Sequence, residues 1–230
     1  MKIIKKFRHF QPSINKIDQI FKLKRAFIVT VNAEIFLHYF IDEKGSSALD
    51  RFETTLDSKF FWKLRTIIVG DSVKDFITGA DAFPIILKWA SETNLKVGLF
   101  GGSLATWPLL KRKLLLDNID LDYELVTENV NADGSLPRAY PLHKLSEFDV
   151  IIVALGSPKQ ERFLLKYEQY FKRDFRFGIG VGGALDFYTG EQKRAPLLFR
   201  KMSLEWVWRY FTSISRFKRF LKALRIFKFF

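Results

Sequence analysis

The chain has 230 residues, of which 48% are hydrophobic and 27% charged. This suits one α/β domain or one domain with an appendage, and it excludes a disordered or fibrous chain. The absence of cysteine excludes disulfide bonds, iron–sulfur clusters, cysteine-ligated zinc and thiol catalysis.

The formal net charge of +13 lies at the two ends of the chain. Residues 1–28 hold eight Lys or Arg against Asp18 alone, and residues 193–230 hold eleven against Glu205 alone. The middle, 29–192, holds 19 basic and 23 acidic residues and is mildly acidic. Cationic ends rich in aromatic residues favour an anionic membrane surface over nucleic acid, which is more often bound by cations spread over a folded face.

The sequence also predicts the location of the protein. No apolar run approaches the ~20 residues of a membrane-spanning helix, and residues 1–10 carry four basic residues without the apolar stretch of a secretory signal. We therefore expect a cytoplasmic protein, peripheral on the inner face of the cell membrane. We divide it into a basic N-terminal segment (1–28), a catalytic domain (29–203) and a basic, aromatic helical appendage (204–230).

Short apolar runs alternate with helical patterns along the chain. The runs predict strands at 26–31, 66–69, 95–100, 149–155 and 176–181, and the helical patterns lie at 33–43, 81–93, 103–117, 158–172 and 204–230. Continuous hydrophobicity indicates strands covered on both faces. We therefore predict an α/β fold, a Rossmann-like parallel sheet with helices on both faces and a C-terminal amphipathic helix.

Ligands in such sheets bind beyond the carboxyl ends of the strands, so the residues there are candidate site residues. Thr30 and Asn32 end the first run, although Asn32 is equally suited to cap a helix. Asp71 follows the second run and suits a general base, with a helix cap or turn as the alternative. Gly101 and Gly102 open a helix and offer backbone N–H groups to an anion, although a tight turn explains them as well.

Two further motifs follow the last two runs. Gly156 to Glu161 contains Pro158, which fits a first helical turn together with Gln160 and Glu161. The segment 178–190 has five glycines, which indicate a close backbone approach to a ligand or a neighbouring element.

Four motifs in register carry a resemblance to a known family. They are Gly-x-Pro-Lys-Gln-Glu, Gly-x-Gly-Gly-x-x-Asp-Phe-x-x-Gly, Arg-Ala-Pro and Glu-Trp-x-x-Arg, within 156–209. Their order and spacing resemble the WecG/TagA/CpsF family (glycosyltransferase family 26), and a looser similarity extends over about 30–220. The resemblance implies inverting, metal-independent transfer of a sugar from a UDP donor to a polyprenyl-diphosphate-linked sugar in cell-envelope glycan synthesis. N-acetylmannosamine, its uronic acid, glucuronic acid and glucose all stay open as the sugar.

The resemblance also assigns roles to residues. Asp71 corresponds to the general base, and the arginines of the appendage would neutralise the departing UDP diphosphate, namely Arg209, Arg216 and Arg219. The expected substrate-binding residues are Thr30, Asn32, Gly101, Gly102, Gly156, Gln160, Glu161, Gly182, Gly183 and Asp186. No metal and no cofactor besides the UDP-sugar is expected, and Asp120-x-Asp122 is given little weight as a metal motif.

The segment after Asp71 departs from the family pattern. The family has Asp-Gly, a longer segment and an Arg before Thr-Gly, whereas here only 73–77 separate Asp71-Ser72 from Thr78, and Phe76 lies near the expected Arg. Asp75 competes with Asp71 for the role of base. The departure keeps an alternative open, a non-catalytic member of the fold that binds a nucleotide sugar or a partner.

The last predicted helix has an apolar stripe with cations along both flanks. The stripe consists of Val207, Tyr210, Ile214, Phe217, Leu221 and Leu224. This layout is typical of a helix in a membrane interface, and a terminal helix packed on the core is the alternative. The exposed apolar face also favours a homo-oligomer.

Overall fold

The computed structural model describes residues 10–40, 49–57, 76–127 and 130–193, together with residues 63, 66, 195, 196 and 199. Within them, six parallel strands form one sheet in the order β2-β1-β6-β5-β3-β4. The strands are β1 (Ala26–Val31), β2 (Glu53–Leu56), β3 (Val97–Gly101), β4 (Tyr123–Val126), β5 (Val150–Ala154) and β6 (Phe177–Gly180).

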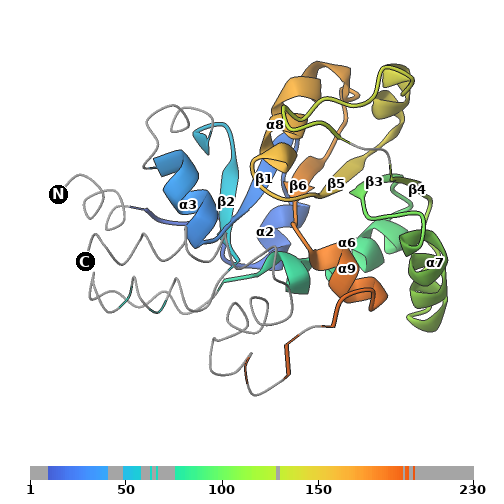
Figure 1. Cartoon of the computed structure of the whole chain (residues 1–230), viewed down its shortest axis with the longest axis horizontal. Coiled ribbons are helices and arrows are strands. Elements are labelled where there is room, and N and C mark those ends of the chain that lie inside the picture. The colour runs from blue at the N-terminus through green and yellow to red at the C-terminus, as the bar shows by residue number, and fades with distance from the viewer. Residues whose placement is uncertain are drawn as a thin grey trace.

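Helices cover both faces of this sheet (Figure 1). One face packs against α3 (Ala33–Phe40), α8 (Lys159–Tyr167) and the 3-10 turn η1 (Leu142–Glu147), which is followed later in the chain by η2 (Glu168–Tyr170). The other packs against α2 (Ile17–Phe21), α6 (Gly79–Glu92), α7 (Thr106–Leu116) and α9 (Ala184–Thr189). The predicted Rossmann-like α/β fold is confirmed.

The strands are continuously apolar because alternate side chains enter two different cores. Val29 and Val31 of β1 lie in one hydrophobic cluster, whereas Ile28 between them lies in the other. Ile151 and Ile152 of β5 are divided in the same way, and all five side chains are buried. Since successive side chains of a strand point to opposite faces, both faces must be apolar.

Four predicted strands are confirmed, at β1, β3, β5 and β6. The predicted strand 66–69 lies outside the described residues except for Thr66, which is helical, and the neighbour of β1 is instead β2 at Glu53–Leu56. The sequence Glu-Thr-Thr-Leu is short and polar, as an edge strand can be, so it gave no apolar run. The edge strand β4 was also not among the predicted strands.

The described part of the basic N-terminal segment belongs to the domain. Ile14 and Ile20 are buried, Phe21 stacks on Trp89 of α6 with ring centroids 4.5 Å apart, and β1 begins at Ala26. The boundary expected at residue 28 therefore falls inside a strand. The appendage 204–230 lies outside the described residues. In the part of the chain that is described, every helix falls short of the length and apolarity needed to cross a membrane.

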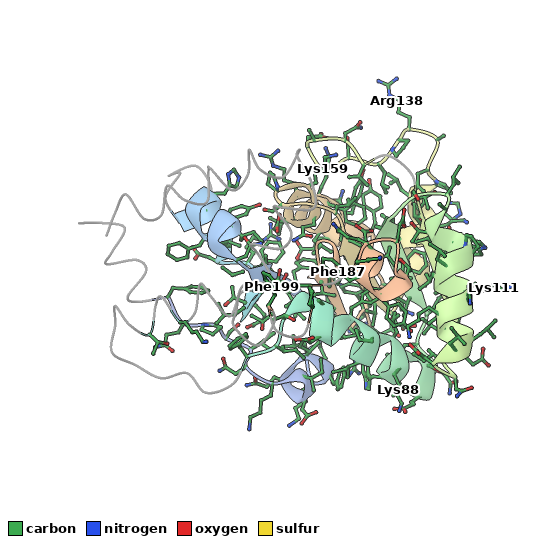
Figure 2. All side chains as sticks on the ribbon, turned by 60° about the horizontal axis from the view of Figure 1, so that its bottom comes forward. Lys88, Lys111, Arg138, Lys159, Phe187 and Phe199 are labelled. Carbon is green, nitrogen blue, oxygen red and sulfur yellow. The ribbon has the colours of Figure 1, made fainter. Side chains whose placement is uncertain are left out.

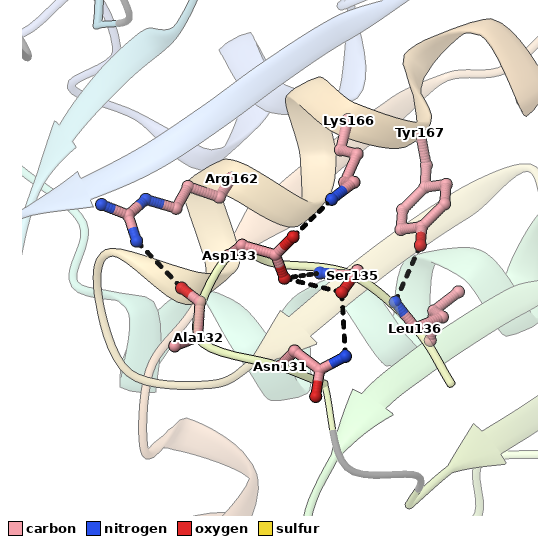
Figure 3. A network of polar contacts seen from close by, with 8 residues as sticks. All are labelled: Asn131, Ala132, Asp133, Ser135, Leu136, Arg162, Lys166 and Tyr167. Atoms are coloured by element: carbon pink, nitrogen blue, oxygen red, sulfur yellow. Dashed lines mark hydrogen bonds and ion pairs between the residues drawn. The ribbon is translucent and has the colours of Figure 1, made fainter. Parts of the chain in front are cut away.

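Polar contacts bind the loop between β4 and η1 to α8 (Figure 3). Lys166 forms an ion pair with the Asp133 carboxylate at 2.6 Å, and Arg162 donates to a loop carbonyl oxygen at 2.9 Å. The Tyr167 hydroxyl accepts the N–H of Leu136 at 2.7 Å. These contacts fix the loop along α8, whose first turn carries Gln160 and Glu161.

Gly134 lies against the backbone of α8. Any side chain at this position is therefore expected to destabilise the protein. The φ of Gly134 is +80°, and a Cβ would lie 2.5 Å from the backbone nitrogen of Phe163. We expect Gly134→Ala to lower the free energy of unfolding by about 2–4 kcal/mol, through left-handed backbone strain and overpacking together. Urea unfolding measures this.

Gly190→Ala is the matched control, because Gly190 has φ +77° and none of the described residues has an atom within 4 Å of its Cβ position. It isolates the backbone strain of about 1 kcal/mol. Equal losses in the two variants would contradict the close packing of the loop on α8.

Candidate functional site

The carboxyl ends of β1, β2 and β6 meet at Gly79, the first residue of α6. A Cβ on Gly79 would lie 3.3 Å from the Thr30 methyl group and 3.3 Å from the carbonyl oxygen of Val181. The backbone N–H of Gly79 donates to the Asp57 carboxylate at 3.0 Å. One residue without a side chain thus brings three strand ends together at the edge where parallel sheets bind ligands.

Asp57 is the carboxylate that follows the second strand of the sheet. Its backbone N–H donates to the carbonyl oxygen of Val31 at 2.9 Å, which extends the pairing of β2 with β1, and the residue is half-buried. Asp71, the predicted base, lies outside the described residues, as does Asp75. Sequence reasoning missed Asp57 because it missed β2. The available signal was the β-branched pair Thr54-Thr55, which Leu56 separates from Asp57.

Gln160 ties the start of α8 to the end of β6. Its side-chain oxygen accepts the N–H of Gly182 at 3.0 Å, and the side chain is only 1% exposed. It fits there because Gly180 has no side chain, since a Cβ on Gly180 would lie 2.7–3.0 Å from the Gln160 amide. From the opposite side, the Thr30 hydroxyl donates to the carbonyl oxygen of Gly180 at 3.0 Å. Two predicted site residues therefore hold one short segment of backbone.

Glu161 is 1% exposed and lies beside Gln160. It accepts a hydrogen bond from the Gln160 side-chain nitrogen at 2.9 Å and one from the Tyr39 hydroxyl at 3.4 Å. Burial raises the pKa of the Glu161 carboxyl, while these hydrogen bonds act to lower it. Burial, followed by the nearby Glu161 carboxylate, raises the pKa of Tyr39. The sequence predicts that Glu161 contacts substrate, and in the structure its carboxylate is buried against Gln160 and Tyr39.

The turn after β6 has space beside the backbone of Gly182, the residue that Gln160 binds. Gly182 has φ +55°, and no atom of the described residues lies within 4 Å of its Cβ position. Gly183 and Asp186, the other residues predicted here, are half-buried and lie at the start of α9. The glycine-rich sequence predicts a close backbone approach to a ligand or a neighbouring element, and the approach of a ligand to this turn stays a prediction.

Other predicted residues have structural explanations. The side-chain oxygen of Asn32 accepts the N–H of Ile35 at 2.9 Å, so the alternative of a helix cap is confirmed for Asn32. Gly101 has φ +129°, and a Cβ there would lie 2.5 Å from the carbonyl oxygen of Ala154. Close packing of β3 against β5 therefore accounts for this glycine.

The turn at Gly102, which has φ +76°, holds a side-chain carboxylate. The N–H of Ser103 donates to the Thr106 hydroxyl at 2.7 Å, and that hydroxyl donates to Glu191 at 2.6 Å. The Ser103 N–H thus has a partner within the chain, and a negative charge already lies beside the turn. The tight-turn explanation of Gly101 and Gly102 is favoured over an anion site.

The remaining predictions divide between the surface and the segments that are not described. Gly156 is exposed, and its carbonyl oxygen accepts the N–H of Lys159 at 3.0 Å. The predicted catalytic arginines lie outside the described residues, namely Arg209, Arg216 and Arg219.

Asp120 and Asp122 precede β4 and therefore lie at the amino edge of the sheet, opposite the candidate site. Asp120 and Asp122 are therefore separated by the length of the sheet from the strand ends described above. Three exposed cations, Lys88, Lys111 and Arg138, point outward from three separate sides of the described surface (Figure 2).

Comparisons with known proteins identify what this chain is similar to. The family model described as "Glycosyl transferase WecG/TagA/CpsF family" matches residues 6–230. A Bacillus spizizenii (strain W23) protein named N-acetylglucosaminyldiphosphoundecaprenol N-acetyl-beta-D-mannosaminyltransferase is 27% identical over 203 residues, which cover 86% of this chain and 76% of that protein. Proteins of the same name from Staphylococcus aureus are 32% identical over 162 residues (strain MRSA252; 66% of this chain, 58% of the relative) and 36% identical over 109 residues (strain NCTC 8325; 47% and 37%).

The buried carboxyl of Glu161 predicts a specific dependence of stability on pH. Its pKa is raised in the folded state above the ordinary value of 4.5. The folded protein therefore binds this proton more tightly, and the stability that the group contributes below pH 4.5 is lost as pH rises through the folded pKa. Urea unfolding of wild type and Glu161→Gln at several pH values isolates the effect.

We expect the free energy of unfolding of Glu161→Gln, minus that of wild type, to increase from pH 4.5 upward. Its slope has a limit of about 1.4 kcal/mol per pH unit. A difference independent of pH would show that the Glu161 pKa is not raised.

Proposed function

The chain belongs to the WecG/TagA/CpsF family of glycosyl transferases, and from that premise we propose the reaction that it catalyses. The chain transfers N-acetylmannosamine, or a related hexose or hexuronic acid, from a UDP donor to a polyprenyl-diphosphate-linked N-acetylglucosamine. The names of the relatives support the acceptor and the first of these sugars. The UDP donor rests on the motifs at 156–209.

One observation supports a catalytic role more than any other. The Asp57 carboxylate lies at the carboxyl edge of the sheet, bound to Gly79, and Gly79 also adjoins Thr30 and Val181 directly before the open Gly182 turn. A carboxylate is thus held next to a backbone that a ligand can approach. This is the pairing that transfer to a hydroxyl group requires, a base beside a donor site.

The proposed step inverts the anomeric carbon. The acceptor hydroxyl oxygen attacks that carbon from the face opposite the diphosphate, the bond from the carbon to the phosphate oxygen breaks, and UDP departs with the electron pair. Asp57 takes the proton of the attacking hydroxyl. Arg209, Arg216 and Arg219 neutralise the diphosphate, and we propose that no metal ion takes part.

If Asp57 is the base, the alternative of a non-catalytic, binding-only protein loses its main support. That alternative rested on the short segment between Asp71 and Thr78. Residues 58–77 separate Asp57 from Thr78, which is the longer segment that the family resemblance implies. The departure that favoured a binding-only protein therefore disappears, apart from Phe76 in place of the expected Arg.

We further propose that the enzyme works as a peripheral protein on the inner face of the cell membrane. The acceptor named for the relatives carries a long polyprenyl chain, and residues 193–230 carry eleven Lys or Arg against one Glu. Cations beside aromatic and aliphatic residues suit an anionic bilayer surface.

The decisive experiment measures acceptor-dependent UDP release with a panel of UDP-sugars, a short-chain polyprenyl-diphosphate-linked N-acetylglucosamine and anionic vesicles. We expect wild type to turn over UDP-N-acetylmannosamine or a related donor. Asp57→Asn should lower kcat by about 10²–10⁴-fold, because the acceptor proton loses its base, while UDP binding measured by calorimetry stays close to wild type.

Asp71→Asn is the matched control, since it makes the same change at the other candidate position. It should keep most of its activity. Full activity in Asp57→Asn with loss in Asp71→Asn would return the base to Asp71. Absence of turnover in wild type with every donor, while UDP still binds, would refute the transferase and favour the binding-only protein.

A further inference from the structure

Two side chains at the start of α8 are buried although one of them carries a carboxylate. Gln160 and Glu161 are each 1% exposed, and they are among the few buried polar residues of the described chain. Burial of a carboxylate costs free energy unless hydrogen bonds compensate for the lost water. The partners of Glu161 therefore indicate what it does.

The partners form a chain of contacts that ends at the backbone of the candidate site. The Tyr39 hydroxyl donates to one Glu161 oxygen at 3.4 Å, and the Gln160 nitrogen donates to the other at 2.9 Å. The Gln160 oxygen then accepts the N–H of Gly182 at 3.0 Å. Three elements distant in sequence are joined in this way, namely α3, α8 and the turn between β6 and α9.

Glu161 decides which way the Gln160 amide points. An amide has a donor end and an acceptor end, and a carboxylate can accept only from the donor end. With the nitrogen held by Glu161, the oxygen must face Gly182. If the amide were reversed, its nitrogen would face the N–H of Gly182, which is also a donor, and both contacts would be lost.

We propose that Glu161 and Tyr39 are positioning residues that act on the sugar donor through Gln160 and Gly182. Glu161 fixes the orientation of the Gln160 amide, Tyr39 holds Glu161 in place, and the amide fixes the Gly182 turn. Gly182 is the residue that a ligand reaches in this proposal, because no atom of the described part of the chain lies within 4 Å of its Cβ position. The nature of the ligand rests on the proposed function.

Gly180 provides the space that the Gln160 side chain needs. Gly180 has room only for hydrogen, since a Cβ there would lie 2.7 Å from the Gln160 amide carbon. The Thr30 hydroxyl holds the Gly180 carbonyl oxygen from the other side at 3.0 Å. The turn is thus held at Gly180 and at Gly182, and only the second hold depends on Glu161.

Three variants of the full chain test the proposal by kinetics with UDP-N-acetylmannosamine as the varied donor. Glu161→Met removes the acceptor, so we expect kcat/KM for the donor to fall at least about 30-fold, with KM raised. Glu161→Gln should restore it to within about 3-fold, because its oxygen can accept from Gln160 and its nitrogen can donate to the Tyr39 oxygen. Tyr39→Phe should lose about 3–10-fold, since its contact is long.

Tyr167→Phe is the matched control for Tyr39→Phe. It also removes a buried tyrosine hydroxyl, but on the last residue of α8, where the hydroxyl binds the N–H of Leu136 instead of a site residue. We expect its donor KM and kcat to equal those of wild type, whatever stability it loses in thermal unfolding. Equal kinetic losses in the two tyrosine variants would overturn the positioning role.

A direct readout of the turn separates this proposal from the proposed function. In protein labelled with ¹⁵N-glycine, with the Gly182 resonance assigned by Gly182→Ala, Glu161→Met should shift the Gly182 amide and Glu161→Gln should leave it nearly unchanged. An unchanged Gly182 resonance in folded Glu161→Met would overturn the positioning role. If wild type neither binds UDP nor turns over donor, the proposed function fails, and the Gly182 resonance still decides the role of Glu161.

Discussion

The hydrogen bond from the N–H of Gly182 to the Gln160 side chain is the interaction on which the candidate site depends. It joins the strand in the centre of the sheet, β6, to the helix that follows its neighbour β5. The Gly182 residue is half-buried, and an intramolecular hydrogen bond of this kind contributes about 0.5–1.5 kcal/mol, so the bond favours one arrangement of the turn while Gln160 is in place. The absence of a side chain at Gly180 and the burial of Glu161 both serve this bond.

The sheet brings the other half of the site to the same edge. Because β1 lies between β2 and β6, its end adjoins both the Asp57 carboxylate and the glycine turn. Gly79 connects these residues. Its N–H donates to Asp57, and its lack of a side chain leaves room for Thr30 and the carbonyl oxygen of Val181. The candidate base and the ligand-facing backbone are thereby attached to one rigid sheet, which is what catalysis needs from a scaffold, since reacting groups must be held in place.

The sequence predicts this architecture wherever hydrophobicity is continuous. The strands β1, β3, β5 and β6 are buried on both faces, and their apolar runs lie within two residues of the observed bounds. The edge strand β2 has the sequence Glu-Thr-Thr-Leu and gave no such signal. Since the base was sought after the second strand, missing β2 placed the sequence prediction at Asp71 and left Asp57 unconsidered. Gln160 was found by its motif, and Thr30 by its place at a strand end.

The burial of Glu161 could not be predicted from the sequence for a different reason. A charged residue beside glycine and proline is ordinarily exposed, and its environment depends on a partner, Tyr39, that lies on another helix far earlier in the chain. Local patterns give periodicity and turns, whereas such a contact exists only after the sheet has brought α3 and α8 onto one face. The motif indicated that Gln160 and Glu161 matter, but not that they act from behind the site.

The glycine turn contributes backbone atoms to the candidate site, and this limits which ligands it can distinguish. The Gln160 oxygen accepts the N–H of Gly182, while the Glu161 carboxylate accepts from the Gln160 nitrogen inside the protein. A backbone held in this way can accommodate a group common to many donors. Choice of the sugar would then come from side chains beside the turn, and among the described residues the Asp186 carboxylate lies 3.9 Å from the Cβ position of Gly183.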